Sequence, residues 1–253
     1  MSMQSLISVI SKRCENVTPV VIAMSGGVDS CLVAAAARQA LKGPVFGVTV
    51  RSELNAAHEF TRAVEVAEFI GLEHHPLCLR VLEDKYVRRN TDERCYHCKR
   101  LIFKMMVLEY GDDCIILDGT NADDDPARPG LLAVREFGVF SPLKEVDMTK
   151  SDVRATAKSI GLPNWNAPSE SCLATRIPIG MPLTADRLEK VNTMELFFHN
   201  LGVETLRARH DNLVATVEFL PQYADIMKKN RDSFAALIER IGLRSYEFKE
   251  WGE

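Results

Sequence analysis

The hexapeptide Ser25-Gly26-Gly27-Val28-Asp29-Ser30 decides the fold of this chain. It follows the apolar run 20–24, which is short, β-branched and not alternating, as in a strand buried on both faces. An alanine-rich segment typical of a helix runs from Asp29 or Ser30 to about Leu41. Glycines at a strand-to-helix turn bring backbone N–H groups against phosphate oxygens, and the helix adds its positive end. The hexapeptide therefore predicts a phosphate-binding loop.

Strand and helix patterns alternate on the carboxyl side of this loop. We expect strands at 45–50, 75–79 and 114–117, and helices at 55–70 and 96–110. Strands that alternate with helices form a parallel sheet with helices on both faces. The predicted fold class is therefore α/β, with a doubly wound parallel sheet and a second, smaller α+β domain.

A second polar loop follows the last of these strands. Ligands of such sheets bind beyond the carboxyl ends of the strands, so this loop and the hexapeptide should share one rim. Asp123 and Asp124 are further candidates to hold metal or substrate, with solvated acids as the alternative. The candidate nucleotide-binding residues are Ser25, Gly26, Gly27, Asp29, Ser30, Asp118, Thr120 and Asn121.

The rest of the chain divides at a proline-rich stretch. We expect a nucleotide-binding domain over 1–162, an irregular loop or linker over 163–183, and a small α+β domain over 184–253. In the hairpin predicted at 203–219, side chains alternate between two faces. One face is expected to carry Leu206, Ala208, Leu213, Ala215, Val217 and Phe219, and the other Arg207, Arg209 and Glu218.

Three cysteines lie in polar surroundings. Cys95 and Cys98 form a C-x-x-C pair among Arg, His and Lys, which favour the thiolate that binds metal. Cys172 lies in the proline-rich loop near Arg176. No second C-x-x-C completes a zinc site, whereas three thiols fit a four-iron four-sulfur cluster with one iron open. The other four cysteines are expected to pack in apolar surroundings: Cys14, Cys31, Cys78 and Cys114.

Composition narrows the class of protein. The 253 residues carry a net charge of −4, whereas a nucleic-acid-binding surface usually leaves a basic footprint. Seven irregularly spaced cysteines indicate thiols or metal ligands rather than a disulfide framework. Neither a signal peptide nor a stretch long enough for a membrane span is evident. We expect a cytoplasmic protein without nucleic-acid or membrane partners.

The hexapeptide lacks the lysine and the spacer of a Walker A loop and resembles the SGGxDS fingerprint of the PP-loop ATP pyrophosphatases. That resemblance implies that ATP is split between its α- and β-phosphates. The loop would hold the pyrophosphate, and Asp29 would help to place Mg²⁺. The other motifs occur in the order found in the LarE family, the ATP-dependent sulfur insertases of nickel-pincer-nucleotide cofactor synthesis: RCYHCK (94–99), LDGTNADD (117–124), ARPG (127–130) and PSESCLATRIPIG (168–180).

The resemblance covers about Val20 to Phe219 and implies the reaction. An adenylated carboxylate of pyridinium-3,5-biscarboxylic acid mononucleotide becomes a thiocarboxylate, and Cys172 handles the sulfur. In one branch of the family this cysteine gives up its own sulfur and becomes dehydroalanine. In another, residues matching Cys95, Cys98 and Cys172 hold a [4Fe-4S] cluster that presents a hydrosulfide. This chain has all three cysteines, so it resembles the cluster branch.

The resemblance also assigns residues of the second domain. The implied catalytic residues are Cys172, Asp29, Glu195 and Arg207, and the implied substrate-binding residues are Arg176, Arg207, Glu218 and Asp225. A guanidinium suits the phosphate of a mononucleotide through paired donors. We expect a small nucleotide as substrate and a homo-oligomer. Arg209 is equally well explained as an exposed charge.

Three other functions use part of the same sequence. A tRNA thiolase of the same superfamily needs the same loop and cysteines but also a basic face. An amide-forming synthetase that uses ammonia has no role for Cys172. A non-catalytic ATP or redox sensor would bind ATP without releasing pyrophosphate.

Overall fold

The computed structural model describes residues 2–251. It consists of two compact units. The larger comprises Met1–Val81 with Glu93–Glu170, and the smaller comprises Leu82–Asp92 with Ser171–Glu253.

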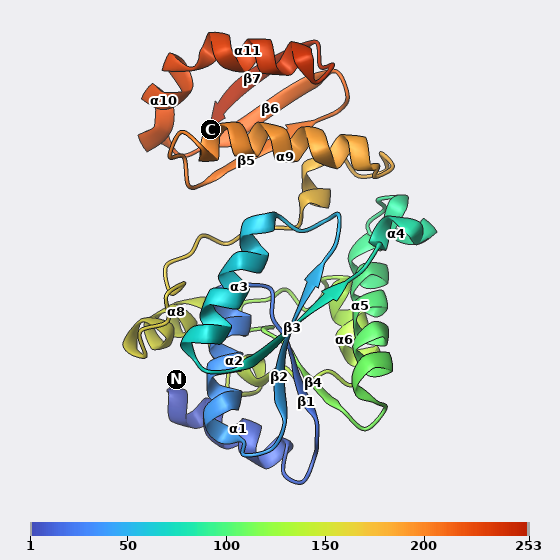
Figure 1. Ribbon diagram of the computed structural model, residues 1–253, viewed down its shortest axis with the longest axis vertical. Helices are drawn as coiled ribbons and strands as arrows, with labels where there is room; N and C mark the ends of the chain where they lie inside the picture. Colours follow the sequence, from blue (N-terminus) through green and yellow to red (C-terminus); the bar gives the residue numbers. More distant parts are fainter. Residues whose placement is uncertain (1, 252–253) are drawn as a thin grey trace. The chain divides into compact units, whose positions relative to one another are not determined.

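The larger unit is built on a parallel sheet, as predicted (Figure 1). The strand order is β3-β2-β1-β4, and every neighbouring pair is parallel. The strands are β1 (Val20–Ala23), β2 (Val45–Arg51), β3 (Glu73–Cys78) and β4 (Ile115–Leu117).

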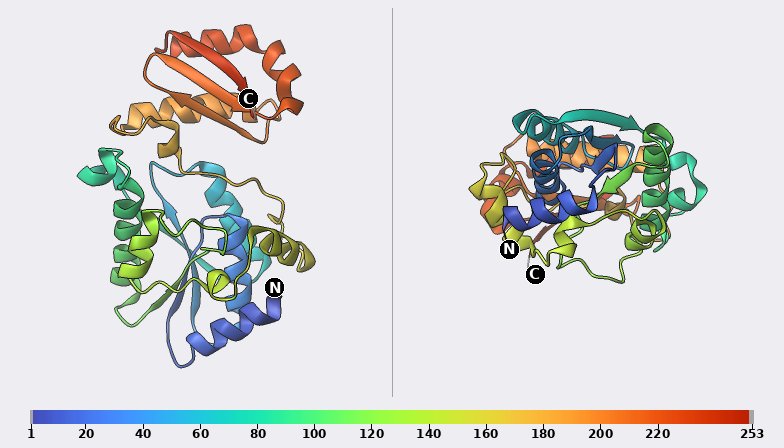
Figure 2. Two further views of the ribbon diagram at one scale, coloured as in Figure 1. Left: turned by 180° about the vertical axis from the view of Figure 1, so that it is seen from behind. Right: turned by 90° about the horizontal axis from the view of Figure 1, so that it is seen from below.

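Each face of this sheet has its own apolar core. Val20 and Ile22 of β1 point into one core, and Val21 points into the other, because successive strand residues face opposite sides. Figure 2 shows α5 and α6 side by side over the second face. The helices of the first core are α1 (Met3–Arg13), α2 (Val28–Ala40), α3 (Ala57–Phe69), α7 (Pro142–Glu145) and α8 (Lys150–Ser159). Those of the second are α5 (Arg94–Tyr110) and α6 (Gly130–Glu136). The doubly wound fold class is thereby confirmed.

The smaller unit has a three-stranded mixed sheet with one buried face. Strand β6 (Val214–Phe219) pairs antiparallel with β5 (Leu206–His210) and parallel with β7 (Ser245–Glu250). Helices α9 (Ala185–His199) and α11 (Arg231–Arg240) close its core, where Phe198 and Phe234 lie 4.8 Å apart between ring centroids. The remaining elements are η1 (Val81–Glu83), α4 (Lys85–Arg88), η2 (Leu173–Arg176), η3 (Pro221–Tyr223) and α10 (Ala224–Lys229).

The units do not follow the boundaries at 162 and 183 that the sequence predicts. The segment 82–92 packs with the loop 171–183, far along the chain. The reason is a set of hydrogen bonds from Asn90, which is fully buried. Its side-chain amide donates to three backbone carbonyls, and its own carbonyl accepts the N–H of Gly180 at 2.9 Å. The three acceptors are the carbonyls of Ile177, Pro178 and Met181.

One residue of the predicted hairpin was assigned to the wrong face. Leu213 was expected in the core but is 46% exposed, because it lies in the turn before β6 begins at Val214. The other five apolar residues of that face are buried as predicted. Within residues 2–251, no helix is long and apolar enough to cross a membrane.

Candidate active site

The phosphate loop is held in shape by its own serines. The hydroxyl of Ser30 accepts the N–H of Ser25 at 3.1 Å and donates to the carbonyl of Gly27 at 3.2 Å. Gly26 has a φ of +76°, and a Cβ there would lie 2.3 Å from the carbonyl oxygen of Glu59 on α3. Only glycine lets the loop pass so close to that helix.

The two polar loops share one rim, as expected from adjacent parallel strands. Ile22 of β1 lies opposite Leu117 of β4, so the loops that follow leave the sheet side by side. A Cβ on Gly119 would lie 2.6 Å from the backbone nitrogen of Ser30. The second loop therefore presses directly on the first turn of α2.

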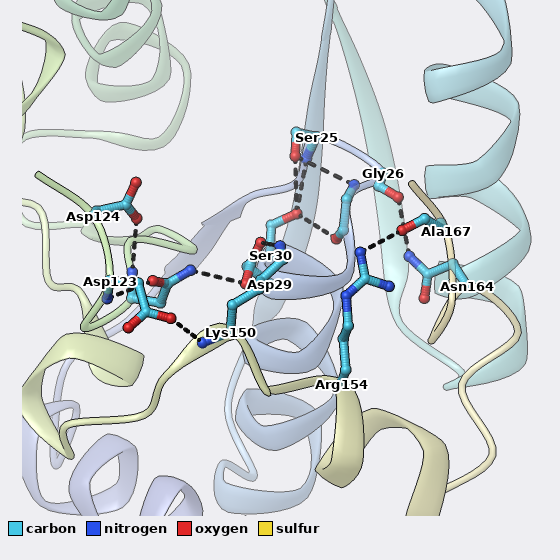
Figure 3. A network of polar contacts seen from close by, with 12 residues as sticks. Ser25, Gly26, Asp29, Ser30, Asp123, Asp124, Lys150, Arg154, Asn164 and Ala167 are labelled. Carbon is cyan, nitrogen blue, oxygen red and sulfur yellow. Dashed lines mark hydrogen bonds and ion pairs between the residues drawn. The ribbon is translucent and has the colours of Figure 1, made fainter. Parts of the chain in front are cut away.

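Asp29 is the centre of a polar network at this rim (Figure 3). Its carboxylate accepts the side-chain N–H of Asn121 at 3.1 Å and forms an ion pair with Lys150. Asn121 in turn accepts the backbone N–H of Asp123 at 2.9 Å, and Asp123 accepts the backbone N–H of Lys150 at 2.7 Å. The ring of contacts ties the phosphate loop, the 118–124 loop and the start of α8 together. Carboxylate oxygens are ligands that Mg²⁺ prefers, so this donor set fits the metal.

Asp118 holds the second polar loop, residues 118–124, in its conformation. It is 5% exposed, and its oxygens accept the hydroxyls of Thr120 at 2.6 Å and Ser141 at 2.7 Å. The ammonium of Lys99 lies 3.6 Å from the same carboxylate. Because both oxygens of its carboxylate already accept hydrogen bonds, Asp118 acts in the structure by holding the loop in shape.

Three residues at the rim were not predicted from the sequence: Lys99, Lys150 and Asn164. Asn164 is 4% exposed and donates to the carbonyl of Gly26 at 3.0 Å. Within the described residues its side-chain oxygen has no hydrogen-bond partner. A signal did exist for Lys150, since Thr149 and Asp152 form the capping box that starts α8.

The C-x-x-C pair lies in the first turn of α5, which begins at Arg94 rather than at Tyr96 as predicted. Cys95 is exposed and Cys98 half-buried, and the guanidinium of Arg94 lies 3.8 Å from the sulfur of Cys95. A Cβ on Gly130 would meet the side chains of both Lys99 and Cys95, so the start of α6 packs on this turn. The Lys99–Asp118 ion pair joins the same helix to the nucleotide rim.

These thiols are metal ligands by chemistry, but the described residues do not assemble them into a site. Two sulfurs three residues apart on a helix share one face, which suits a common metal centre. Cys172, the third candidate, belongs to the smaller unit. Across the described part of the chain, no three His, Cys, Asp or Glu side chains are grouped so as to hold a metal ion. The cluster ligands therefore stay a prediction.

Two of the four cysteines that were expected to pack do so. Cys31 is fully buried, and burial raises the pKa of its thiol to about 12. Burial likewise raises the pKa of Cys14 to about 11. The expectation was wrong for Cys78, which is exposed because it ends strand β3 at the edge of the sheet. Cys114 is half-buried just before β4.

In the smaller unit, the loop that carries Cys172 is held by a buried ion pair. Arg176 is 4% exposed, and its Nε donates to Glu195 at 2.7 Å. A second nitrogen of the guanidinium donates to the hydroxyl of Ser171 at 2.7 Å. Glu195, on α9, also accepts the backbone N–H of Ala208 on β5 at 3.0 Å. Glu195 therefore connects the cysteine loop to both α9 and the sheet.

A second set of contacts fixes the other end of this loop. The backbone N–H and the hydroxyl of Thr175 both donate to the carbonyl of Cys172, at 2.9 and 2.8 Å. Arg209 then donates to the carbonyl of Thr175 at 2.6 Å and to Glu218 at 3.1 Å. Arg209 is therefore part of the loop's support, rather than only an exposed charge.

The outer face of the hairpin carries a concentration of arginine. Arg207 lies directly opposite Glu218 in the register of β5 and β6. Burial lowers the pKa of Arg207, and the positive charges of Arg176 and Arg209 lower it further. Asp225, in the first turn of α10, is exposed and forms no ion pair with these arginines in the described residues. The arginines offer several N–H donors to an anion. Because Arg207 is partly buried beside other arginines, a positive charge without a partner is costly there.

Comparisons with known proteins bear on both units. A profile of the asparagine synthase family matches residues 4–97, which include the phosphate loop. The chain is 35% identical over 207 residues to pyridinium-3,5-bisthiocarboxylic acid mononucleotide synthase of Lactiplantibacillus plantarum, an alignment that covers 80% of this chain and 75% of the relative. It is 34% identical over 205 residues to an uncharacterised protein of Synechocystis, covering 79% and 76%. An uncharacterised protein of Methanocaldococcus jannaschii is 28% identical over 237 residues, covering 91% and 87%.

Proposed function

Since this chain belongs to the family of the pyridinium-3,5-bisthiocarboxylic acid mononucleotide synthases, we propose that it is an ATP-dependent sulfurtransferase of nickel-pincer cofactor synthesis. Its substrate is pyridinium-3,5-biscarboxylic acid mononucleotide, and its product carries a thiocarboxylate. The proposal is carried by one observation: the phosphate loop, which its own serines hold in shape, meets the 118–121 loop at one rim of the sheet, and Asp29 lies between them.

The first half-reaction activates the carboxylate. A carboxylate oxygen of the substrate attacks the α-phosphorus of ATP, the bond to the bridging oxygen breaks, and pyrophosphate leaves. The backbone N–H groups of the loop 25–30 and the positive end of α2 stabilise the departing charge. Asp29 would hold Mg²⁺, which when bound neutralises phosphate charge and orients the leaving group. The ammonium of Lys150, which pairs with Asp29, lies within this network and can turn to a phosphate oxygen.

The second half-reaction replaces AMP by sulfur. The thiolate of Cys172 attacks the adenylated carbonyl, AMP leaves, and a thioester to the protein forms. Loss of the Cα proton to a base and cleavage of the Cβ–S bond would then release the thiocarboxylate and leave dehydroalanine. This route consumes one protein chain for each sulfur that is transferred.

The pair Cys95 and Cys98 points to a catalytic alternative to that sacrifice. We infer that these two thiols and Cys172 hold a [4Fe-4S] cluster, which when bound supplies hydrosulfide in place of the cysteine's own sulfur. Arg94, whose guanidinium lies 3.8 Å from the sulfur of Cys95, favours an anionic sulfur ligand there. The inference requires the three thiols to come together around one cluster.

The reaction is tested by its products. Purified protein with Mg·ATP, the biscarboxylic acid mononucleotide and a sulfide source is expected to form AMP and pyrophosphate together with a thiocarboxylate, which mass spectrometry detects. ADP and inorganic phosphate as primary products would contradict the proposal. An amide formed with ammonia, or pyrophosphate release that depends on tRNA, would instead identify one of the other two enzyme classes.

The sulfur source is tested separately. Anaerobic reconstitution with iron and sulfide should give a brown protein, and Ser in place of Cys95, Cys98 or Cys172 should weaken or abolish the colour. Cys114→Ser is the matched control, since Cys114 is also half-buried but outside the proposed ligand set. Dehydroalanine at position 172 after one equivalent of product would refute the cluster route.

We further propose that the protein acts on its small nucleotide as a homo-oligomer and without a nucleic-acid partner. The net charge of −4 supports the second statement. Light scattering on the purified protein measures the first, and filter binding with labelled tRNA measures the second. A monomeric mass or tight tRNA binding would contradict the corresponding statement.

A further inference from the structure

The last described residue, Trp251, lies against the arginine cluster of the smaller unit, which consists of Arg176, Arg207 and Arg209. The backbone N–H of Trp251 donates to the carbonyl of Phe219 at 2.8 Å, which extends the pairing of β7 with β6 by one residue beyond Glu250. The guanidinium carbon of Arg207 lies 4.8 Å from the centroid of the Trp251 ring. The end of β7 is therefore fixed to the sheet with its indole over Arg207.

Arg207 differs in its ion pairing from the two other arginines of the cluster. Arg176 is paired with Glu195, and Arg209 with Glu218. Within residues 2–251, the side chain of Arg207 forms no ion pair, and its guanidinium lies over the ring of Trp251. Among the described residues, the three guanidinium groups of Arg176, Arg207 and Arg209 have two carboxylate partners, so an external anion is a suitable partner for Arg207.

The position of the Arg207 guanidinium is electrostatically unfavourable. Burial and two like charges disfavour the charged form of Arg207, and its pKa is lowered accordingly. A long arginine side chain without a constraint would turn toward solvent, where its charge is hydrated. The aromatic ring offsets this, because a guanidinium over an indole face is attracted to the ring's quadrupole.

The contact with the ring also bears on what Arg207 can bind, since its guanidinium carbon lies over the ring of Trp251. A guanidinium whose flat face lies on a ring keeps its N–H donors free in the plane. Those donors match the two oxygens of a carboxylate or a phosphate. Trp251 therefore restrains Arg207 without occupying the groups that recognise an anion.

We propose that Trp251 is a positioning residue, which holds the guanidinium of Arg207 so that its N–H edge receives an oxyanion of the mononucleotide substrate. The proposal rests on the proposed function, since it names how one charged group of that substrate is recognised. The oxyanion is the 5′-phosphate or a ring carboxylate, which share the same chemistry.

Substitution of Trp251 separates positioning from folding. Trp251→Leu keeps an apolar side chain but removes the π face, and Trp251→Phe keeps a smaller one. Trp251→Leu should raise KM for the mononucleotide about 2- to 30-fold with kcat little changed, because the ring acts on binding. Trp251→Phe should recover most of the affinity. Equal KM values in wild type and the Leu variant, or a Phe variant no better than Leu, would overturn the proposal.

Binding alone gives a second measurement that does not need turnover. Nicotinic acid mononucleotide, a pyridinium nucleotide with one carboxylate, is titrated by calorimetry into wild type, Trp251→Leu and Arg207→Ala. Both variants should bind it more weakly, and Trp251→Leu should weaken it less than Arg207→Ala. Two analogues then identify the anion: nicotinamide mononucleotide keeps only the phosphate, and nicotinic acid riboside keeps only the carboxylate. The analogue whose affinity falls in the Leu variant carries the recognised group.

The outcomes distinguish this inference from the proposed function. If the analogue binds in a Trp251-dependent manner but no thiocarboxylate forms, the proposed function fails and the anion site stands. If thiocarboxylate forms at an unchanged KM in Trp251→Leu, the proposed function stands and the positioning role of Trp251 fails.

Discussion

The nucleotide rim of the larger unit and the arginine cluster of the smaller unit are both networks of paired charges, but the excess charge has opposite sign. At the rim, four carboxylates face three cations: Asp29, Asp118, Asp123 and Asp124 against Lys99, Arg128 and Lys150. In the cluster, three arginines face two glutamates: Arg176, Arg207 and Arg209 against Glu195 and Glu218. The first network suits a metal-bound phosphate chain, and the second suits an organic anion.

The two networks also differ in how freely they can change. The side chains of Asp29 and Lys150 are 20% and 30% exposed, so water can replace one partner when a ligand arrives. Arg176 and Glu195 are only 5% and 8% exposed. Separating that buried pair would leave a charge without a partner in a poorly solvated place. The rim is therefore an exchangeable site, whereas the Arg176–Glu195 pair is a fixed support for the Cys172 loop.

The largest effect is expected at the rim. Asp29→Asn removes the charge that would orient Mg²⁺ and should slow pyrophosphate release about 100- to 1000-fold, the loss typical of a preorganised electrostatic group. Binding of nicotinic acid mononucleotide to the arginine cluster should be unchanged. Asp125→Asn, on the same loop but exposed, is the control. An unchanged rate of pyrophosphate release, measured by an enzyme-coupled assay, would remove Asp29 from the mechanism.

A large effect on stability is expected in the smaller unit. Glu195→Leu leaves the buried guanidinium of Arg176 uncompensated and should lower the free energy of unfolding by about 3–5 kcal/mol. The double variant Arg176→Met with Glu195→Leu should regain much of that loss, because no charge is then buried alone. Urea unfolding measures both. A single variant as stable as wild type would mean that the pair does not support the loop.

A smaller effect is expected for the unpaired arginine. Arg207→Ala should raise KM for the mononucleotide about 10- to 100-fold, the value of hydrogen bonds to a charged group. ATP binding and the fold should be retained, because Arg207 lies on the polar face of the hairpin. Lys249→Ala is a matched control, since Lys249 is exposed on the same face opposite Glu218. Equal KM values in both variants would show that Arg207 is ordinary surface.

The smallest effect is expected at the end of the larger unit. There the carboxylate of Glu170 forms hydrogen bonds with His58 at 2.7 Å and with Arg62 at 3.2 Å. The hydrogen bond to Glu170 raises the pKa of His58. Burial raises the pKa of Glu170, but His58 and Arg62 together bring it below its ordinary value.

These shifts set the pH window of the contact. It stabilises fully between the ordinary pKa values of Glu, 4.5, and His, 6.5, and fades as pH rises through the raised pKa of His58. Because the pair is partly exposed, His58→Ala should cost at most about 1 kcal/mol in that window and less at high pH, where the imidazole is neutral. Urea unfolding at both pH values tests this, and a loss that does not vary with pH would contradict it.

The parallel sheet and its phosphate loop could be predicted from the sequence because their signals are local. The buried run 20–24, the glycine turn and the alanine-rich helix lie next to one another, and each has its own pattern. The alternation of Arg207, Arg209 and Glu218 with apolar residues likewise predicted the polar face of the hairpin.

Long-range pairings were not predictable in the same way. Lys99, Lys150 and Asn164 reach the rim from separate helices and loops, and no local pattern states where their side chains end. Asn90 joins 82–92 to the cysteine loop across some ninety residues of chain, through backbone carbonyls that carry no sequence signal. No pattern in the sequence marks Trp251, and only the strand pairing brings it to Arg207.

The central claim is that carboxylate activation at the rim and a sulfur transfer that requires Cys172 are separate half-reactions. A single-turnover experiment with Cys172→Ala, Mg·ATP and the biscarboxylic acid mononucleotide tests it most directly, with pyrophosphate and thiocarboxylate measured in the same quenched samples. The account predicts a burst of one pyrophosphate per active site and no thiocarboxylate. Thiocarboxylate formed without Cys172, or loss of the pyrophosphate burst in a correctly folded variant, would contradict it.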